Sequence, residues 1–376
     1  MDLYIVKPGD TLWKLARRFG TSAEQLAADN QLSDPNRLLP NMALVVPGAE
    51  GERQEIIANA YAYPNVSGEV LAETLPALSF LAPFSHRLTA GGALVPLDDA
   101  ALSEAALARG VLPFLTVTNL GESGGFSSDI AHAVFTDPAV QDAALENVLA
   151  ALSRRRYGGV NLNLEYVYPF DRESYNQFLR RLSELLHARG WYLVTAIAPK
   201  ESADQTGLLY AAHDYAAHGR WADWVVLMTY EWGYTYSAPQ AVSPVNRIRR
   251  VLDYAVTQMP AGSILLGMSN YGYRWTLPWR QGDAATVVSN AAAINLAVSV
   301  GAELRYDETA QAPWFRYTDA EGLRREVWFE DARSVRARLA LVKDYGLAGL
   351  SWWTVNRLFR PALEIQQSLF RPVKMI

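Results

Sequence analysis

Residues 157–182 read YGGVNLNLEYVYPFDRESYNQFLRRL, and this stretch decides the fold that the sequence predicts. From Val160 to Glu165 apolar and polar residues alternate, which is typical of a strand with two different faces. Its polar face would carry Asn161, Asn163 and Glu165 into the interior of a barrel. A polar row that ends in a carboxyl group at the carboxyl end of a strand is typical of catalytic barrels. A buried structural hydrogen-bond network is the alternative interpretation of the same row.

Seven further β-rich runs lie before and after this strand, and helical patterns separate most of them. The eight runs are 56–63, 78–84, 111–118, 159–167, 192–198, 224–230, 263–271 and 346–353. Strands that alternate with helices in this way predict an α/β protein with a (β/α)8 barrel. A doubly wound open sheet is the alternative, although no G-x-G-x-x-G follows the first run. Surplus aromatic-rich sequence between the seventh and eighth runs predicts a small α+β insertion at about residues 300–331.

Composition excludes several classes of protein. The 376 residues are 50% hydrophobic and 19% charged, which is typical of a globular chain and not of a disordered one. The net charge of −5 argues against a nucleic-acid binder that neutralises phosphates. There is no cysteine, and the five histidines show no metal-ligand spacing, so we expect neither a metal nor a cofactor. No run is long enough for a membrane span, and the N-terminus lacks the pattern of a signal peptide.

The first 48 residues have a separate pattern of a short strand, two short helices and a second strand. Within them YIVKPGDTLWKLARRFGTSAEQLAADNQL, at residues 4–32, resembles the LysM domain. The resemblance implies binding of glycans that contain N-acetylglucosamine, as in peptidoglycan or chitin oligosaccharides. The sugar contacts that it implies are Gly9, Asp10, Thr11, Leu12 and Asn30. The alternative is that Asp10 and Thr11 only cap a helix and that Asn30 only ends one.

These patterns divide the chain into parts. We expect a βααβ module at residues 1–48 and the barrel with its insertion at residues 56–376. Residues 49–55 between them are small and charged, which predicts a linker.

Aromatic residues gather just after the predicted strands, among 11 Trp, 19 Tyr and 12 Phe in the chain. Flat rings stack on the apolar faces of sugars, and tyrosine hydroxyls bond to their edges. Core packing is the alternative for any single ring, but it does not predict a concentration on one rim. We therefore expect a saccharide cleft there. Its predicted contacts, besides Asn161, are Tyr61, Phe84, Tyr166, Trp232, Tyr271, Tyr273 and Trp353.

Residues 157–182, together with LMTYEWGY at 227–234, NYGYRWTLP at 270–278 and GLAGLSWWTVNR at 346–357, resemble glycoside hydrolase family 18. With the LysM module, the chain is similar to the cortex-lytic N-acetylglucosaminidases of spore germination (YaaH/SleL type). The resemblance implies that Glu165 is the general acid and base and that the acetamido oxygen of the substrate is the nucleophile. It also implies that Tyr230 holds the acetamide and that Glu231 is a second acidic helper.

Asn163 departs from the family pattern, which has an acid two residues before the catalytic Glu. An amide accepts a hydrogen bond but supplies no charge, and loss of one such electrostatic element commonly costs about 10²–10³ in rate. One hypothesis is therefore a glycosidase of peptidoglycan, with spore cortex as the expected substrate. The other is a catalytically weak or inactive glycan-binding or spore-coat protein. An aldolase-type barrel with a Schiff base at Lys200 is a third reading.

The resemblance also bears on location. It implies deposition in the spore coat or cortex, and a cytoplasmic or wall-associated protein is the alternative. The expected partner in each case is a glycan that contains N-acetylglucosamine.

Overall fold

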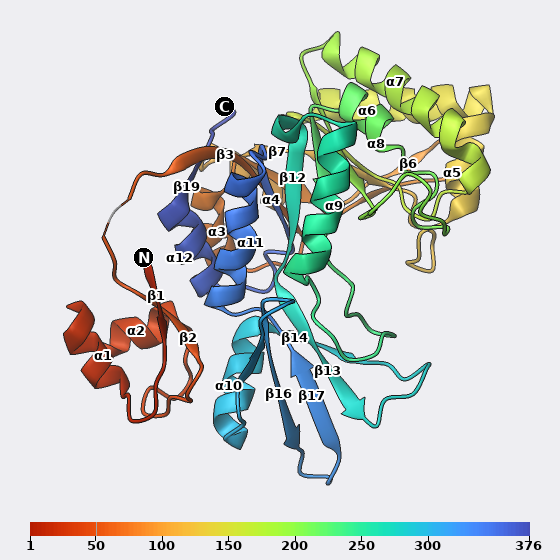
Figure 1. Cartoon of the computed structure of the whole chain (residues 1–376). Coiled ribbons are helices and arrows are strands. Elements are labelled where there is room, and N and C mark those ends of the chain that lie inside the picture. The colour runs from red at the N-terminus through yellow and green to blue at the C-terminus, as the bar shows by residue number, and fades with distance from the viewer. Residues whose placement is uncertain (50) are drawn as a thin grey trace.

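The computed structural model describes residues 1–49 and 51–376 (Figure 1). Residue 50 of the predicted linker lies outside the described residues. Strand β3 begins at Gln54, two residues before the predicted start of the barrel at 56. The reason is that Gln54 and Glu55 pair with Phe370 and Arg371 of the C-terminal strand β19 (Phe370–Pro372), a partner that a strand pattern alone does not reveal.

The N-terminal module has the predicted βααβ order. Its elements are β1 (Asp2–Ile5), α1 (Leu12–Phe19), α2 (Ala23–Asp29) and β2 (Ala43–Val46). The two strands pair antiparallel, with Tyr4 opposite Leu44. Helix α1 begins after Thr11, whose hydroxyl accepts the backbone N–H of Lys14, and ends at Gly20 in the left-handed conformation.

The predicted (β/α)8 barrel is confirmed. Its eight strand positions are β3 (Gln54–Ala62), β4 (Phe80–Pro83) with β5 (His86–Leu88), β7 (Leu112–Pro113) with β8 (Leu115–Thr118), β9 (Gly159–Asn163), β10 (Tyr192–Ile197), β11 (Trp224–Leu227), β12 (Ile264–Ser269) and β18 (Gly349–Trp353). Neighbouring positions pair in parallel, and β18 pairs with β3. The barrel closes between the second and third positions, where β4 pairs with β7 and β5 pairs with β8. The short strand β6 (Leu94–Val95) forms a hairpin with β5.

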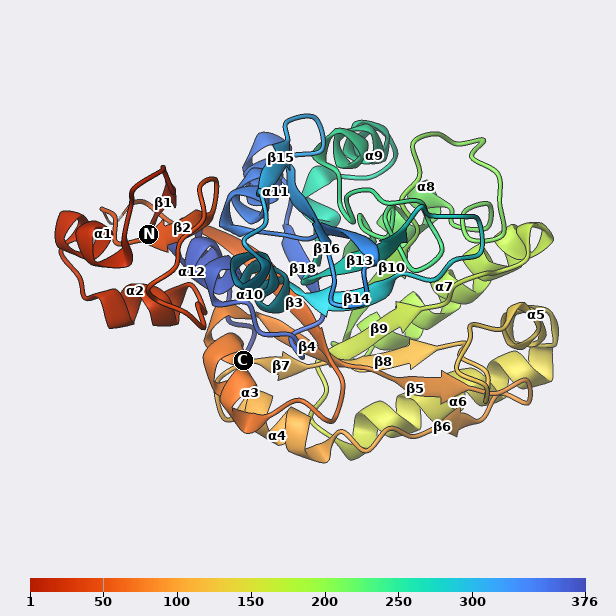
Figure 2. The same ribbon diagram turned by 90° about the horizontal axis from the view of Figure 1, so that it is seen from below.

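Helices cover the outside of the barrel (Figure 2). They are α3 (Gly68–Thr74), α4 (Ala100–Leu107), α5 (Ser128–Thr136), α6 (Pro138–Arg154), α7 (Arg172–His187), α8 (Tyr215–Trp221), α9 (Val245–Gln258), α11 (Ala332–Asp344) and α12 (Arg360–Leu369). Helix α7 shows the physical basis, because Phe178, Leu182 and Leu186 recur at helical spacing and are buried against the strands. Among the described residues, no helix combines the length and the hydropathy needed to cross a lipid bilayer.

The α+β insertion is present, but the predicted bounds of 300–331 are too narrow. Its antiparallel sheet has the order β14-β13-β17-β16-β15 and begins at Tyr271. The elements are β13 (Tyr271–Leu277), β14 (Thr286–Ser289), α10 (Asn290–Val300), β15 (Arg305–Asp307), β16 (Ala312–Thr318) and β17 (Arg324–Trp328). Only Asn270 separates β13 from barrel strand β12, so the alternation pattern passes from one sheet to the other without a visible break.

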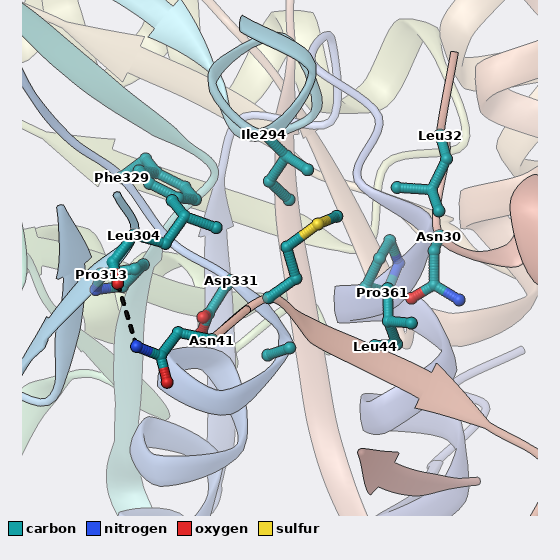
Figure 3. A pocket seen from close by; sticks show the side chains of 12 residues that line it. Asn30, Leu32, Asn41, Leu44, Ile294, Leu304, Pro313, Phe329, Asp331 and Pro361 are labelled. Atoms are coloured by element: carbon teal, nitrogen blue, oxygen red, sulfur yellow. Dashed lines mark hydrogen bonds between the residues drawn. The ribbon is translucent and has the colours of Figure 1, made fainter. Parts of the chain in front are cut away.

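The N-terminal module packs against the insertion and α12 (Figure 3). The side chain of Gln31 donates to the carbonyl of Leu358 (3.3 Å) and accepts the N–H of Arg360 (2.9 Å). On α10, Asn295 accepts from Ser33 (2.9 Å), and Asn41 donates to the carbonyl of Leu304 (3.1 Å). Apolar side chains fill the seam between these bonds, including Met42, Leu44, Ile294 and Phe329. The segment 31–41 is therefore engaged by the barrel unit.

Candidate active site

A cleft opens beyond the carboxyl ends of the barrel strands, with a cavity volume of about 780 Å³. Loops after several strands contribute to its wall, as barrel architecture predicts. The structure brings many of the predicted residues together there. Those that line the cleft are Tyr61, Phe84, Asn163, Glu165, Tyr166, Tyr230, Glu231 and Trp353.

Glu165 lies in this cleft two residues after the end of β9. One of its carboxyl oxygens accepts a hydrogen bond from the amide of Asn163 (3.2 Å). The pKa of Glu165 is raised to about 7, chiefly by burial and also by the negative charge of Glu231, against the lowering effect of the Asn163 bond. A carboxyl group with this pKa holds a proton near neutral pH and can donate it to a substrate.

Asn163 has a second polar atom that the protein does not use. Its side chain is 3% exposed, and its amide nitrogen donates to Glu165. Its carbonyl oxygen is buried and has no hydrogen-bond partner among the described residues. An orphaned buried acceptor is costly, and its position beside the acid marks a place for a donor on a ligand.

Glu231 lines the same cleft and has a positive φ of 66°. This left-handed backbone is uncommon outside glycine and stores strain, which is concentrated at functional sites. The carboxylate accepts hydrogen bonds from the hydroxyls of Tyr271 and Tyr273, the second at 3.0 Å. The two phenols therefore fix the direction of a negative charge in the cleft.

Tyr230 lies beside Glu231, and burial raises the pKa of its phenol well above the ordinary value. The hydroxyl thus keeps its proton over the physiological range. It makes no hydrogen bond in the described part of the structure, so it is available as a donor to a ligand.

The floor of the cleft is aromatic. The Trp353 ring meets Phe84 edge-on at 4.8 Å and Tyr61 at 5.2 Å between centroids. Tyr63 joins this group and is 39% exposed, although it is not among the predicted sugar contacts. Its spacing of two residues from Tyr61 on β3 was the signal, because alternate strand residues share a face.

Four predicted sugar contacts are not among the residues that line the cleft. Asn161 is fully buried beneath Tyr61, whose hydroxyl donates to it (3.1 Å). Tyr271 and Tyr273 are buried behind Glu231, and their hydroxyls are occupied by its carboxylate. Trp232 packs against the main apolar core instead. Asn161, Tyr271 and Tyr273 thus each hydrogen-bond to a residue that does line the cleft.

Lys200 does not line the cleft either. It is 1% exposed, and its ammonium group donates to the backbone carbonyls of Ala203 and His213 at 3.3 Å. Burial lowers its pKa, but the group is closed off from a carbonyl substrate. The Schiff-base hypothesis is therefore not supported by the geometry.

The predicted sugar contacts of the N-terminal module divide into two sets. Gly9 and Thr11 are exposed, and Asp10 is partly exposed while its carboxylate accepts from Tyr4 and from the backbone N–H of Lys7. The last bond is the largest cause that lowers the pKa of Asp10.

Leu12 and Asn30 form the other set, and both are buried, each 2% exposed. Leu12 packs in the core of the module. The Asn30 amide donates to the carbonyls of Leu26 and Val45 and accepts the N–H of Val45. Its polar atoms are thus used inside the module.

No set of three or more acidic or histidine side chains in the described ranges is arranged to hold a metal ion. The side chains of the cleft offer a carboxyl group with a raised pKa, a directed carboxylate, a phenol donor and an aromatic floor.

Comparisons with known proteins show the family of this chain. The family model described as glycosyl hydrolases family 18 matches residues 121–357, and that of the LysM domain matches residues 4–47. The cortical fragment-lytic enzyme of Bacillus subtilis is 41% identical over 430 residues, which cover 100% of this chain and 99% of the relative. The crystal structure of the spore cortex-lytic enzyme SleL of Bacillus cereus has a TM-score of 0.83 and 35% identity, covering 99% of this chain and 87% of that one. SleL of Bacillus megaterium gives a TM-score of 0.82 and 32% identity, covering 100% and 87%.

Proposed function

Since the chain belongs to family 18 of the glycosyl hydrolases and is a glycosidase, we propose that it hydrolyses N-acetylglucosaminyl bonds of peptidoglycan, with spore cortex as its substrate. The observation that carries the proposal is the Glu165 carboxyl group, with its raised pKa, beside the free acceptor of Asn163 in a cleft with an aromatic floor. The printed names of the relatives, which refer to cortical fragments and to spore cortex, support the choice of substrate.

The first chemical step uses the proton of Glu165. The carboxyl group donates it to the glycosidic oxygen, and the bond from that oxygen to the anomeric carbon breaks. The acetamido oxygen of the same sugar forms a new bond to the anomeric carbon, which gives a cyclic oxazolinium ion. No nucleophile of the enzyme is needed, and this is the substrate-assisted exception among retaining glycosidases.

The second step reverses the proton transfer. The Glu165 carboxylate takes a proton from water while the water oxygen attacks the anomeric carbon and opens the oxazolinium ring. The configuration is retained because the anomeric carbon is displaced twice. A pKa near 7 suits this exchange, since the group must act first as an acid and then as a base.

Three side chains would hold the acetamide. The Tyr230 phenol donates to the acetamido carbonyl, and the orphaned oxygen of Asn163 accepts the acetamido N–H. Glu231 supplies the negative charge that Asn163 lacks, at a direction set by its two phenol donors. Trp353 lies under the sugar ring.

A catalytically weak or inactive glycan-binding protein is the second candidate function. The observation that favours it is Asn163, since an amide cannot offset the positive charge of the oxazolinium ion. In that case the cleft binds N-acetylated glycans without releasing reducing ends.

Release of reducing ends from purified spore cortex and from vegetative peptidoglycan tests the proposal. We expect the wild type to release them from cortex and Glu165→Gln to release none. If the wild type is inactive and Asn163→Asp restores activity, the binding function would be established instead. Equal turnover by Glu165→Gln would reject the assignment of the acid.

We also propose that the LysM module retains the protein on the glycan and that the protein acts in the spore coat or cortex. Its 9–11 loop is exposed, whereas segment 31–41 forms hydrogen bonds to the barrel unit through Ser33 and Asn41. Fractionation of spores followed by immunodetection tests the location, and recovery only in the soluble cytoplasmic fraction would contradict it.

A further inference from the structure

The backbone pairing of strand β9 with its neighbours in the barrel ends just before Glu165. Pairing of β9 with β8 ends at Asn163, and pairing with β10 ends at Leu162. Leu164 and Glu165 therefore have no strand partner for their backbone groups, although buried backbone groups in proteins are almost always paired. Tyr166 follows with a positive φ of 54°, so the chain does not continue into regular structure.

One buried side chain takes both backbone groups of Glu165. Asn119, which directly follows β8 and is 0% exposed, accepts the N–H of Glu165 at 3.0 Å. Its amide nitrogen donates to the carbonyl of Glu165 at 2.8 Å. The carboxamide thus replaces one residue of a neighbouring strand, and it does so at the residue whose carboxyl group enters the cleft.

The same amide reaches the rim of the cleft. Its nitrogen also donates to the carbonyl of Ser127 at 3.0 Å, and the backbone N–H of Ser127 donates to the carbonyl of Asn119 at 2.9 Å. The loop between these two residues carries Leu120 and Phe126, which line the cleft. Asn119 therefore connects the acid with a loop that borders its substrate.

The preceding peptide is held from the other side. His213 donates from Nε2 to the carbonyl of Leu164 at 3.0 Å, while its Nδ1 accepts the N–H of Ala198 at 3.0 Å. A backbone N–H only donates, so Nδ1 is the acceptor and Nε2 carries the proton. Burial lowers the pKa of His213 to about 4, which keeps this tautomer neutral in the working range of pH.

We infer that Asn119 is a positioning residue for the general acid: it sets the direction of the Glu165 carboxyl group without touching the substrate. The inference rests on the proposed function, in which Glu165 is that acid. Positioning matters because a displacement of about 1 Å at a reacting group can cost about 10²-fold in rate. The next chain segment provides no regular structure that could replace the clamp.

Asn30 offers a matched control. It makes the same clamp on Val45, accepting its N–H at 2.8 Å and donating to its carbonyl at 2.9 Å, and it is also buried. A third bond to the carbonyl of Leu26, at 2.9 Å, parallels the bond of Asn119 to Ser127. The chemistry is the same, but Asn30 lies in the LysM module and does not line the cleft.

The test compares Asn119→Ser, Asn119→Ala and Asn30→Ala on soluble cortex fragments. We expect both Asn119 variants to lose about 10²-fold in kcat with KM nearly unchanged, and Asn30→Ala to keep the wild-type kcat. The pKa of Glu165, measured by ¹³C NMR of its carboxyl carbon, should fall in Asn119→Ser because a loosened acid reaches water. This titration needs no turnover.

The outcomes separate the two proposals. If the wild type releases no reducing ends, the proposed function is rejected. If the pKa of Glu165 is still lower in Asn119→Ser than in the wild type, the positioning role of Asn119 is kept. The Asn119 variants could instead keep the wild-type kcat and the pKa of Glu165 and show only a lower melting temperature. Asn119 would then be a merely structural residue, and the inference would be overturned. Failure of both Asn119 variants to fold would overturn it in the same way.

Discussion

Glu165 is half-buried and Glu330 is buried, and desolvation raises the pKa of each to about 7, yet their surroundings differ. Glu165 contacts an amide and faces an open cleft, and it forms no salt bridge in the described part of the chain. Glu330 is 1% exposed and lies 2.9 Å from the guanidinium of Arg338, which is buried to the same degree. A raised pKa therefore does not by itself mark a catalytic acid. Access to substrate and the absence of a bound cation make the difference.

The largest expected effect is that of Glu165→Gln. The amide has nearly the same shape but no transferable proton, so kcat should fall by about 10²–10⁴-fold. The measurement is the initial rate of reducing-end release, with unfolding followed to show that the fold is intact. Glu330→Gln, assayed as folded protein, is the matched control and should keep its kcat. Equal losses in the two variants would remove the distinction between the two acids.

Glu330→Gln should instead reduce stability. It leaves the guanidinium of Arg338 buried without its counter-ion, which costs about 3–5 kcal/mol in comparable cases. Urea unfolding at pH 7 measures the change in the free energy of unfolding. Replacing both partners, as in Glu330→Leu with Arg338→Met, should recover most of the loss. A single variant as stable as the wild type would show that the pair contributes nothing.

Asn163→Asp would place a negative charge beside Glu165, in contrast to the positive charge beside Glu330. A carboxylate at 163 would lie against the acid where Glu330 has a cation, so the pKa of Glu165 should rise. If the missing charge limits the reaction, kcat should increase by up to about 10²-fold. Asn161→Asp is the control, since Asn161 faces Tyr61 and not the acid. A decrease in kcat would mean that the cleft is adapted to the amide.

The smallest expected effect is on the pH profile. The proposed mechanism requires protonated Glu165, so it predicts that kcat/KM falls about tenfold per pH unit once the pH rises above about 7. The native state also binds protons at Glu165 and Glu330 that the unfolded state releases near pH 4.5. The contribution of both acids to stability is thus complete below pH 4.5 and is lost as the pH rises through about 7. Glu330→Gln should change the stability profile alone; a shift of its activity profile would contradict this.

Much of the fold and the central acid could be predicted because their signals are local. Alternation at period two and apolar faces at helical spacing identify strands and helices within a few residues. The polar row that ends at Glu165 is of this kind, and so is the aromatic rim. The start of the insertion was missed because β12 and β13 form one uninterrupted pattern although they belong to different sheets.

The partners of buried polar residues were not predictable in this way. The sequence by itself determined the strand–helix order, the carboxyl group at the end of β9 and the rings near it, since these depend on neighbours along the chain. Only the tertiary structure decided that Asn30 and Asn119 are backbone clamps, because their partners Val45 and Glu165 lie 15 and 46 residues away. It also decided which glutamate faces a cleft and which faces an arginine. Burial and hydrogen bonding depend on what folding brings together, and a residue type in isolation carries no record of it.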